Sequence, residues 1–420
     1  MRKKIVMLLF NNFSNDARVL KEGKSLAEIG YDVELICVQE NKKALLPSKE
    51  SVVPYFHVTR IGGEKKQRVT LLALCLLVIS IAILVGNLLG ILLSVMVFFI
   101  LQIPKIQCTV LMGITIMTMA VVARSRKANY FQAHDLNTLP QAHFAAKSRL
   151  QKKQLIYDSH EVQTSREGYN GWLHKKVEQF YIQKIDFMIV ENDTRAAFNE
   201  QLYGFLPGVI HNYPEYEEEI TNNKFIHELL ELPPNEKILL YQGVINPGRG
   251  LEKLVEAAPL FKEGTLVFIG DGRQKAALQK RVIELKLTSR VKFISKVPLH
   301  ELKNYTQQAF LGFQVLNNTC FNHYSASSNK LFEYIAAEIP VIACEFPEIK
   351  KVVDGDKVGI CIDSHSPKAI AAGVNYMIQD LARYQNFKDN TKKIKKKYIW
   401  DREKEQLEFY YKHLGLKEQK

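Results

Sequence analysis

The sequence is poor in cysteine and proline, and it lacks the spacings that usually give those residues a structural role. Its 420 residues include six cysteines, with no C-x-x-C pair and no set of four Cys and His ligands, so a disulfide framework and a structural zinc site are not expected. Only 14 residues are proline, whereas 24% are charged and 10% aromatic, which excludes a mainly disordered or collagen-like chain. RNP-like motifs, zinc-finger spacings and repeats are also missing. We therefore expect two or three globular domains and no nucleic-acid partner.

Charge is absent from one long segment of the chain. No charged side chain occurs from Val69 to Pro104 or, after Lys105, from Ile106 to Ala123. A membrane-spanning helix needs about 20 apolar residues, so this block has room for two crossings or for a buckled hairpin. Lysine and arginine flank it on both sides, and the positive-inside rule then places both flanks in the cytoplasm, with Lys105 near the far turn. We expect an even number of crossings or a re-entrant hairpin.

The distribution of charge along the chain also suits a membrane-associated protein. Residues 1–210 hold 26 Lys and Arg against 17 Asp and Glu, whereas the later residues hold 31 against 27. A basic N-terminal half suits an anionic membrane surface.

Outside the block, strand patterns alternate with helix patterns. Residues 4–10 predict a strand, residues 17–29 a helix that ends at Gly30, and residues 33–38 the next strand. Such strand–helix–strand units are typical of doubly wound, parallel sheets. Further strands are predicted at 130–133, 155–157, 187–190, 237–241, 265–269, 291–294, 311–315 and 340–343. The pattern predicts an α/β protein with two Rossmann-like domains facing each other across a cleft, and a membrane hairpin inserted in the first.

Loops rich in glycine follow the first strands of the second series. Gly243 comes after the strand at 237–241, and Gly270 and Gly272 come after the strand at 265–269. Glycine lets a backbone approach a ligand, and a helix N-terminus offers free N–H groups to phosphate. Arg249 and Lys330 add full positive charges close to such loops. Together these features predict a site for a nucleoside diphosphate.

Several strings along both domains carry a resemblance to a known family. They are NDARVLKEGKSLAEIGYDVELI (15–36), AHDLNTLP (133–140), YDSHE (157–161), YQGVINPGRGLEKLVEA (241–257), FIGDG (268–272), VPLHELKNYTQQAFLGF (297–313) and SNKLFEYIAAEIPVIA (328–343). In these strings the chain resembles the retaining, GT-B fold glycosyltransferases often called family 4. The resemblance implies transfer of a sugar from a UDP- or GDP-linked donor, with retained configuration and without a metal or another cofactor.

The resemblance also implies roles for individual residues. Glu333 matches the glutamate that holds the ribose hydroxyls, and Arg249 matches the cation that neutralises the leaving phosphate. Lys330, with the N–H groups of Asn329 to Leu331, falls where the diphosphate lies. The glycine that lets the diphosphate approach corresponds to Gly243.

The N-terminal domain supplies the rest of the expected site. His134 matches a histidine beside the reacting sugar, and Asn15 and Asp16 match the region between donor and acceptor. His160 ends a predicted strand, and we expect it to contact the acceptor. The resemblance further implies that a C-terminal helix packs back on this domain.

Two positions depart from the family pattern. Ser325 stands where a glutamate is common, eight residues before Glu333, and we expect it to contact the donor sugar. Val244 stands where an arginine usually follows the glycine of the 243 loop. A serine can bond a sugar hydroxyl, but it cannot neutralise positive charge.

These features divide the chain into two domains and two smaller parts. We predict an acceptor domain of residues 1–68 and 124–210, a membrane hairpin at 69–123, a donor domain at 211–395 and the returning helix at 396–420. The expected function is sugar transfer at the cytoplasmic face of the inner membrane, to a lipid-linked glycan of a cell-surface polysaccharide. Two alternatives stay open, a sugar-nucleotide epimerase of similar fold and a non-catalytic membrane-bound scaffold.

Overall fold

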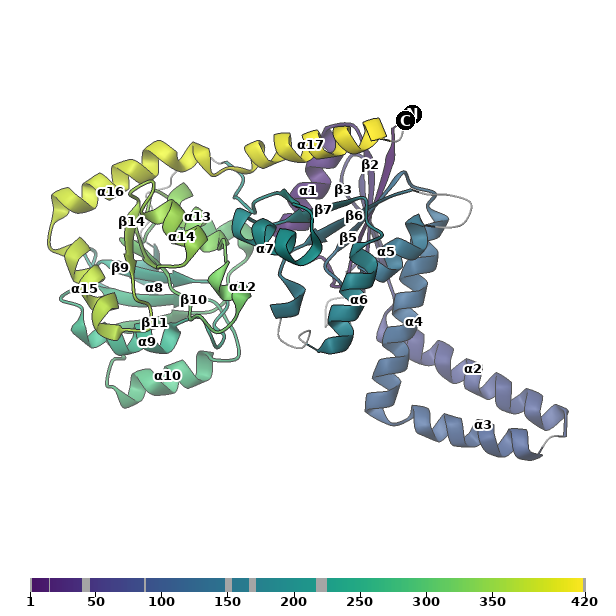
Figure 1. Ribbon diagram of the computed structural model, residues 1–420. Coiled ribbons are helices and arrows are strands. Elements are labelled where there is room, and N and C mark those ends of the chain that lie inside the picture. Colours follow the sequence, from purple (N-terminus) through teal and green to yellow (C-terminus); the bar gives the residue numbers. More distant parts are fainter. Residues whose placement is uncertain are drawn as a thin grey trace. The chain divides into compact units, whose positions relative to one another are not determined.

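The computed structural model describes residues 2–14, 16–39, 46–86, 88–147, 153–165, 171–216 and 225–417, which form two compact units (Figure 1). The N-terminal unit consists of the described residues within 1–163, 171–189 and 410–420. The C-terminal unit consists of those within 164–170 and 190–409.

The first sheet has the strand order β3-β4-β2-β1-β5-β6-β7-β8. The strands from β1 to β6 pair in parallel, except that β3 is antiparallel to β4. Without the edge strands β3 and β8, the order is third, second, first, fourth, fifth, sixth, as in a Rossmann fold. The strands are β1 (Lys4–Leu9), β2 (Asp32–Val38), β3 (Lys49–Val53), β4 (Phe56–Ile61), β5 (Tyr130–His134), β6 (Gln154–Ser159), β7 (Phe187–Val190) and β8 (Gly208–Val209).

The second sheet has six strands in the order β11-β10-β9-β12-β13-β14, and all of its pairings are parallel. This is again the Rossmann order, with its reversal between β9 and β12. The strands are β9 (Ile238–Gln242), β10 (Thr265–Ile269), β11 (Val291–Ile294), β12 (Leu311–Gln314), β13 (Val341–Cys344) and β14 (Gly359–Ile362). The prediction of two Rossmann-like parallel sheets is therefore confirmed.

The helices follow the strands in the alternation that the sequence predicts. In the first series they are α1 (Ala17–Glu28), α5 (Leu139–Ala146), α6 (Trp172–Ile182) and α7 (Asp193–Tyr203). In the second series they are α8 (Phe225–Leu229), α9 (Leu251–Ala257), α10 (Lys275–Glu284), α11 (Leu299–Thr306), α12 (Phe321–Tyr324), α13 (Asn329–Ala336), α14 (Pro347–Val353), α15 (Pro367–Ile378) and α16 (Leu381–Ile394). The last helix is α17 (Trp400–Lys417), and short 3-10 turns lie at 163–165, 258–260 and 395–397.

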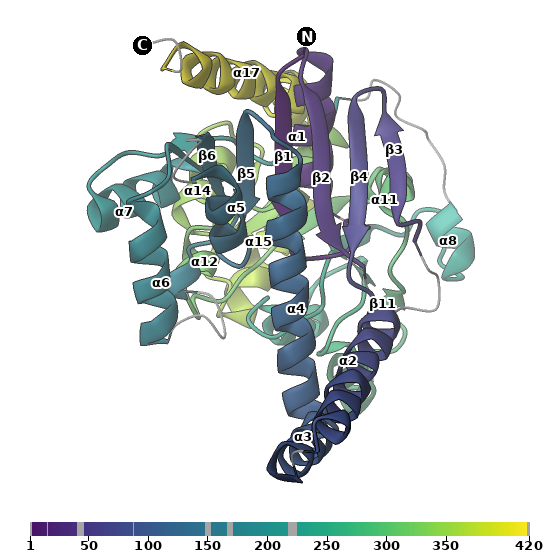
Figure 2. The ribbon, with the colours of Figure 1, turned by 90° about the vertical axis from the view of Figure 1, so that its right-hand side faces the viewer.

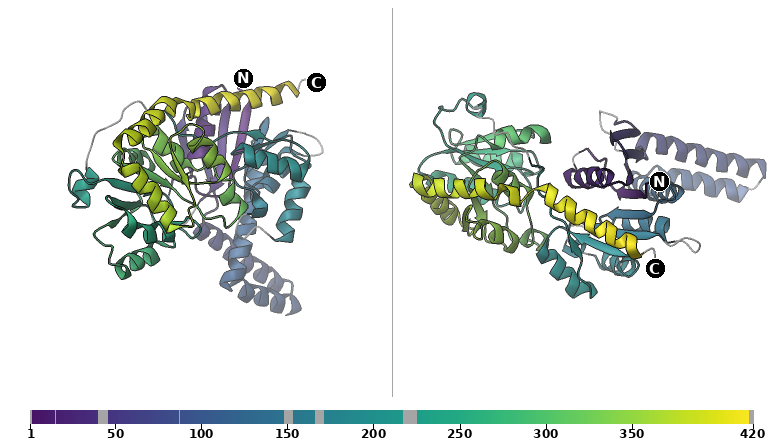
Figure 3. Two further views of the ribbon diagram at one scale, coloured as in Figure 1. Left: turned by 60° about the vertical axis from the view of Figure 1, so that its left-hand side comes forward. Right: turned by 90° about the horizontal axis from the view of Figure 1, so that it is seen from above.

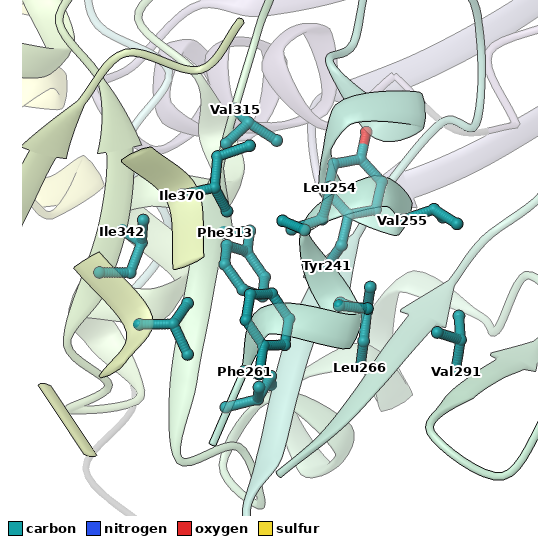
Figure 4. Packing of buried hydrophobic residues seen from close by; sticks show 14 of the residues in the cluster. Tyr241, Leu254, Val255, Phe261, Leu266, Val291, Phe313, Val315, Ile342 and Ile370 are labelled. Carbon is teal, nitrogen blue, oxygen red and sulfur yellow. The ribbon is translucent and has the colours of Figure 1, made fainter. Parts of the chain in front are cut away.

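Apolar side chains fill both faces of the second sheet, as parallel strands require. Figure 4 shows one face, where Tyr241, Leu254, Phe313 and Ile370 come together from a strand, a helix, a strand and a helix. The rings of Phe261 and Phe313 stack there with their centroids 6.3 Å apart.

The apolar block forms three helices, whereas the sequence led us to expect a two-part hairpin. They are α2 (Glu64–Leu84), α3 (Leu88–Leu101) and α4 (Pro104–Ser125). Helices α2 and α3 contact each other and extend together from the N-terminal end of α4 (Figures 1 and 3). Among the described helices, α4 alone is both long and apolar enough to cross a membrane, with a mean hydropathy of 2.0 over its most apolar part, and it is partly buried.

Helix α4 belongs to the Rossmann unit as much as to the apolar block. Its later turns contact β1, β2, β4 and α5 (Figure 2). The residues of α4 that are buried are Leu111, Thr115, Met119, Ala120 and Ala123. Lys105 lies in its first turn, at the base of the α2–α3 pair. It is therefore not near the far turn, which the chain makes after α2, at Val85 and Gly86.

Glycine at position 312 of β12 leaves room for a buried tyrosine. A Cβ atom at Gly312 would lie 2.5 Å from Cγ of Tyr334. The Tyr334 hydroxyl donates to the carbonyl of Leu240 at 3.1 Å and accepts from the N–H of Gln242 at 3.2 Å. The small residue therefore fixes a ring that braces the end of β9.

We expect Gly312→Ala to lower the stability of the protein by roughly 1–3 kcal/mol, because a fully buried ring must shift. Urea unfolding followed by tryptophan fluorescence measures the change. Gly113→Ala is the control, since nothing lies within 4 Å of a Cβ atom there. Alanine is the better helix former, so the control should be neutral or slightly stabilising. Equal effects of the two substitutions would contradict this account of Gly312.

Candidate active site

The donor side of the candidate site lies where the second sheet reverses its order. Ligands in such sheets bind beyond the carboxyl ends of the strands at this reversal. Gly243 follows β9 with φ 122°, and Gly270 follows β10 with φ 149°. A Cβ atom at Gly270 would lie 2.0 Å from the carbonyl oxygen of Gly243, and one at Gly272 would lie 2.2 Å from that of Ile245. Only glycine therefore lets the two loops meet.

Lys330 points to this loop from the start of α13. Its side chain is buried, and a Cβ atom at Gly243 would touch its Cε at 3.4 Å. Its ammonium donates to the Tyr241 hydroxyl at 3.4 Å and lies 4.5 Å from the centre of that ring. Burial, and then the charge of Arg249, lower the pKa of Lys330 to about 7. Two cations thus lie close together beside a glycine loop, a state that an anionic ligand would relieve.

Glu333 lies one helical turn further along α13. Its Oε2 accepts a hydrogen bond from Nε2 of Gln242 at 2.5 Å, and Oε1 of Gln242 accepts from the hydroxyl of Thr306 at 2.7 Å. Sequence reasoning missed Gln242 and Thr306, although Gln242 is the last residue of an otherwise apolar strand. That position signals a polar group at the carboxyl end of β9.

Three other predicted donor residues have protein partners or settings of their own. Ser325 is fully buried, and its hydroxyl accepts from Nε of Arg195 at 3.2 Å and donates to the carbonyl of Phe321 at 2.8 Å. The N–H of Leu331 donates to the carbonyl of Ser328 at 3.0 Å. Asn329 is exposed at the start of α13. Arg195, which the sequence reasoning did not include, thus holds Ser325 in place.

The acceptor side lies at the corresponding reversal of the first sheet, between β1 and β5. His134 ends β5, and Asp158 lies near the end of the next strand, β6. Oδ2 of Asp158 is 3.0 Å from Nδ1 of His134 and 3.1 Å from Nε2 of His160. Arg18 donates to both oxygens of Asp158, at 2.8 and 3.2 Å. The sequence reasoning named both histidines but not the carboxylate and guanidinium that join them.

The charges of this group set the roles of the two histidines. Burial would raise the pKa of Asp158, but Arg18 and His160 hold it well below its usual range. Burial would lower the pKa of His160, but Asp158 and Asp135 raise it to about 10. An ionised carboxylate can only accept, so both ring nitrogens donate to Asp158. His134 then has a proton on Nδ1, and in the neutral ring its Nε2 is an acceptor.

Nε2 of His134 is buried and has no hydrogen-bond partner in the part of the chain that the structure describes. Buried polar atoms are rarely left unpaired in proteins. A hydroxyl group of a ligand would satisfy this nitrogen.

The predicted acceptor residues Asn15 and Asp16 precede α1. Asn15 lies outside the described residues. Asp16 caps the helix, because its Oδ1 accepts from the N–H of Val19 at 3.3 Å, while Oδ2 accepts from the side chain of Asn11 at 3.1 Å. The carboxylate thus has a structural task at the end of the loop after β1.

His134, Asp158 and His160 also form a group whose ligand atoms lie within 4.8 Å of one another, which is close enough to hold a metal ion. The same atoms already bond each other, and Arg18 occupies both oxygens of Asp158. A guanidinium at this distance repels a cation. The group therefore fits a hydrogen-bonded cluster better than a metal centre.

Comparison with known proteins identifies the region that holds the donor residues. Residues 222–394 match the family described as Glycosyl transferases group 1. The match covers less than half of the chain, and we call this matching segment the group 1 glycosyltransferase domain. It contains Gly243, Arg249, Lys330 and Glu333, so the expected enzyme class, a glycosyltransferase, is confirmed.

Two curated proteins resemble shorter parts of the chain. An uncharacterized glycosyltransferase of Methanocaldococcus jannaschii is 25% identical over 171 residues, which are 40% of this chain and 42% of that protein. A putative colanic acid biosynthesis glycosyl transferase, WcaI of Escherichia coli, is 45% identical over 53 residues, 12% of this chain and 13% of that one. The chain thus matches less than half of either relative.

Solved structures show the fold of the whole chain. The match to sucrose-phosphate synthase from Thermosynechococcus elongatus covers 99% of this chain and 100% of that chain, with a TM-score of 0.75 and 16% sequence identity. The match to Anabaena HepE, solved with UDP and glucose, covers 98% of this chain and 100% of that chain, with a TM-score of 0.67 and 14% sequence identity. The group 1 glycosyltransferase domain is therefore the second half of a GT-B fold with two Rossmann-like sheets.

The low pKa of Lys330 gives a pH signature of ligand binding. Above pH 7 the free protein holds Lys330 largely neutral, and a bound diphosphate restores the charge. We expect proton uptake when UDP or GDP binds at pH 8, and weaker binding as the pH rises further. Calorimetry in two buffers of different ionisation enthalpy measures the uptake. Lys330→Met should abolish it, and uptake by that variant would contradict the assignment.

Proposed function

We propose that the protein transfers a sugar from a nucleoside diphospho-sugar to a hydroxyl of an acceptor, with retention of anomeric configuration. The observation that carries this proposal is the meeting of Gly243, Arg249, Lys330 and Glu333 within the group 1 glycosyltransferase domain. Their cations suit a diphosphate, and the carboxylate suits the two vicinal hydroxyls of a ribose. Anabaena HepE was solved with UDP, and by analogy we favour UDP as the nucleotide of the donor. GDP is the other candidate.

The chemistry needs stabilisation of a leaving group above all. Breaking the glycosyl phosphate bond leaves negative charge on the diphosphate and positive charge on the sugar. Arg249 and Lys330 stabilise the diphosphate as its charge grows. Nε2 of His134, which is an acceptor, orients a hydroxyl of the reacting sugar or of the acceptor. These groups supply the stabilisation from the chain itself, and we keep the prediction that no metal takes part.

We further propose a lipid-linked glycan as the acceptor, in the synthesis of a cell-surface polysaccharide. The apolar helices leave the N-terminal unit, which we expect to bind the acceptor. A distant relative is named for colanic acid biosynthesis, which agrees with such a role. An anchored acceptor unit would meet a lipid-linked substrate at the bilayer surface.

The lengths of the helices favour insertion into one leaflet over a crossing. The apolar part of α2, Leu71–Leu84, and the whole of α3 each have 14 residues. At about 1.5 Å per residue each is roughly 21 Å long, against about 30 Å for the hydrocarbon core. No described residue of α3 is buried, and large apolar side chains such as Leu88, Phe99 and Ile100 are exposed. Such a surface fits lipid.

Helix α4 cannot complete a crossing without leaving the Rossmann unit. Its buried residues from Leu111 to Ala123 pack on the sheet and on α5, so only its first two turns extend beyond the unit. Both ends of the block therefore return to one unit. We place that unit on the cytoplasmic side of the inner membrane, where nucleotide sugars are found and where the basic flanks of the block favour it.

A screen with nucleotide sugars tests the transferase proposal. Membranes containing the protein are offered UDP- and GDP-sugars with a lipid extract, and nucleotide release and labelled lipid are followed. We expect release and transfer with one donor, and a loss of at least about 100-fold for Arg249→Ala and Glu333→Ala, since we assign both residues to donor binding. Arg281→Ala, an exposed arginine on α10 paired with Glu284, is the control.

Other results of the screen would point elsewhere. Release of a free epimerised sugar nucleotide without an acceptor would indicate an epimerase. Absence of UDP and GDP binding in the intact protein would indicate a scaffold, and either result would refute the proposal.

Cysteine labelling tests the one-leaflet hairpin. In a variant whose native cysteines are serine, Gly86→Cys puts a thiol at the α2–α3 turn. We expect no reaction with a membrane-impermeant maleimide added to either side of sealed vesicles, because the turn lies inside the bilayer. Labelling from the far side would show a crossing, and labelling from the cytoplasmic side would show that the turn is not inserted. Ser14→Cys, at an exposed position before α1, is the control and should react from the cytoplasmic side.

A further inference from the structure

The C-terminal helix ends on a polar chain that runs through the interior of the N-terminal unit. The hydroxyl of Tyr411, on α17, donates to Oε1 of Gln132 at 2.6 Å, across 279 residues of sequence. Nε2 of Gln132 donates to Oε2 of Glu22 at 2.8 Å. Oε1 of Glu22 forms an ion pair with Nε of Arg18 at 3.0 Å, without a hydrogen bond, because that N–H donates to Oδ2 of Asp158. The chain therefore reaches from a helix near the C-terminus to the carboxylate that holds both histidines.

Regular geometry explains why these residues meet. Tyr130, Gln132 and His134 alternate along β5, so their side chains point to the same face of the sheet. Arg18 and Glu22 are four residues apart on α1, on one face of that helix. One face of β5 thus presents an aromatic ring, an amide and an imidazole to α17 and α1.

Every member of the chain is buried, which makes each bond expensive to lose. Tyr411, Gln132, Glu22 and Asp158 have no exposed surface, and Arg18 is 4% exposed. A buried polar group that loses its partner regains no hydrogen bond from water, and for a charged group the loss is larger. These buried side chains therefore stay in the one arrangement in which their polar groups are paired.

Each bond also fixes the direction of the next. The phenol of Tyr411 donates, so the oxygen of the Gln132 amide faces α17 and its NH₂ faces Glu22. Glu22 is thereby kept against Arg18, and the guanidinium holds both oxygens of Asp158. Asp158 in turn orients the ring of His134.

Aromatic rings surround Tyr411 and hold its hydroxyl, the first hydrogen-bond donor of the polar chain, in place. Its ring lies 5.5 Å from that of Tyr130 and 5.6 Å from that of Tyr31, in edge or tilted contacts. Leu414, one turn later, is also buried. The last turns of α17 are thus part of the interior of this unit.

We propose that Tyr411, Gln132 and Glu22 are positioning residues for His134, so that the C-terminal helix completes the acceptor side of the active site. They act through Arg18 and Asp158, which fix the orientation of the His134 ring. The inference rests on the proposed transferase function for its kinetic consequence but not for its structural one.

The kinetic test uses Tyr411→Phe in the full-length, membrane-bound protein. Loss of the hydroxyl leaves the Gln132 oxygen without its donor, and we expect a fall in kcat of about tenfold with the KM for the donor within about twofold. The residues assigned to the nucleotide sugar lie in the other unit, so a positioning role predicts a lower kcat with an unchanged KM for the donor. Tyr410→Phe is the matched control. It removes a hydroxyl from the preceding residue, whose ring centre lies 4.9 Å from that of Phe187, and should leave kcat unchanged.

A spectroscopic test does not depend on activity. In protein labelled with ¹⁵N-histidine, the imidazole signals that vanish in His134→Gln and His160→Gln identify the two rings. Tyr411→Phe should shift the His134 signal, and Tyr410→Phe should not. Should Tyr411→Phe fail to fold, Gln132→Glu keeps the shape of the side chain but sets a second carboxylate against Glu22, and we expect the same shift and a larger fall in kcat.

Unchanged kcat and unchanged His134 signals in the folded Tyr411→Phe variant would overturn the proposal. A wild-type protein that transfers no sugar, together with the expected shift of His134, would refute the transferase function and leave the positioning chain in place. The two failures are therefore distinguishable.

Discussion

The ion pair between Arg18 and Asp158 is the interaction on which the N-terminal half of the site depends. Both side chains are buried, and the guanidinium reaches both carboxylate oxygens. Breaking such a pair leaves an uncompensated buried charge, which typically costs about 3–5 kcal/mol. The pair ties α1 to the end of β6, and through Asp158 it decides the orientation of His134. Helix, strand and histidine are therefore set by one salt bridge.

The donor side uses charge in the opposite way. Arg249 and Lys330 lie close enough for one to lower the pKa of the other, and burial adds to that effect. The acceptor half thus neutralises its charges within the protein, whereas the donor half keeps a positive excess that an anion would balance. This contrast agrees with a rigid acceptor unit and a donor loop that binds a diphosphate.

The order of strands and helices could be predicted from the sequence because buried parallel strands are short apolar runs with polar loops between them. The three helices of the apolar block could not be separated in the same way. Leu111 and Met112 have the same apolar character, yet one is buried in the Rossmann unit and the other is half exposed. Pro104 at the start of α4 was the available signal, since proline is favoured in the first turn of a helix.

The candidate site was predicted in part, for a similar reason. Residues at strand ends, such as His134 and Gly243, stand out because the topology sends ligands there. Gln132 does not, since its partners Glu22 and Tyr411 are 110 and 279 residues away in sequence, and Glu22 does not, since Gln132 is 110 residues away. Polar residues at alternate positions of an otherwise buried strand, as in YFQAH at 130–134, are the pattern that would have revealed them.

Helix α4 links the proposed membrane contact to the acceptor side of the site. Its later turns bury Met119 and Ala123 against the same sheet that carries His134, while its first turns support α2 and α3. A helix held at one end by a packed core cannot rotate freely, because buried side chains fix its position. Insertion of α2 and α3 in one leaflet would therefore fix the orientation of the N-terminal unit relative to the lipid surface. A lipid-linked acceptor, held by its own chains in that surface, would then meet the unit in a restricted range of directions, which reduces the entropy lost on binding.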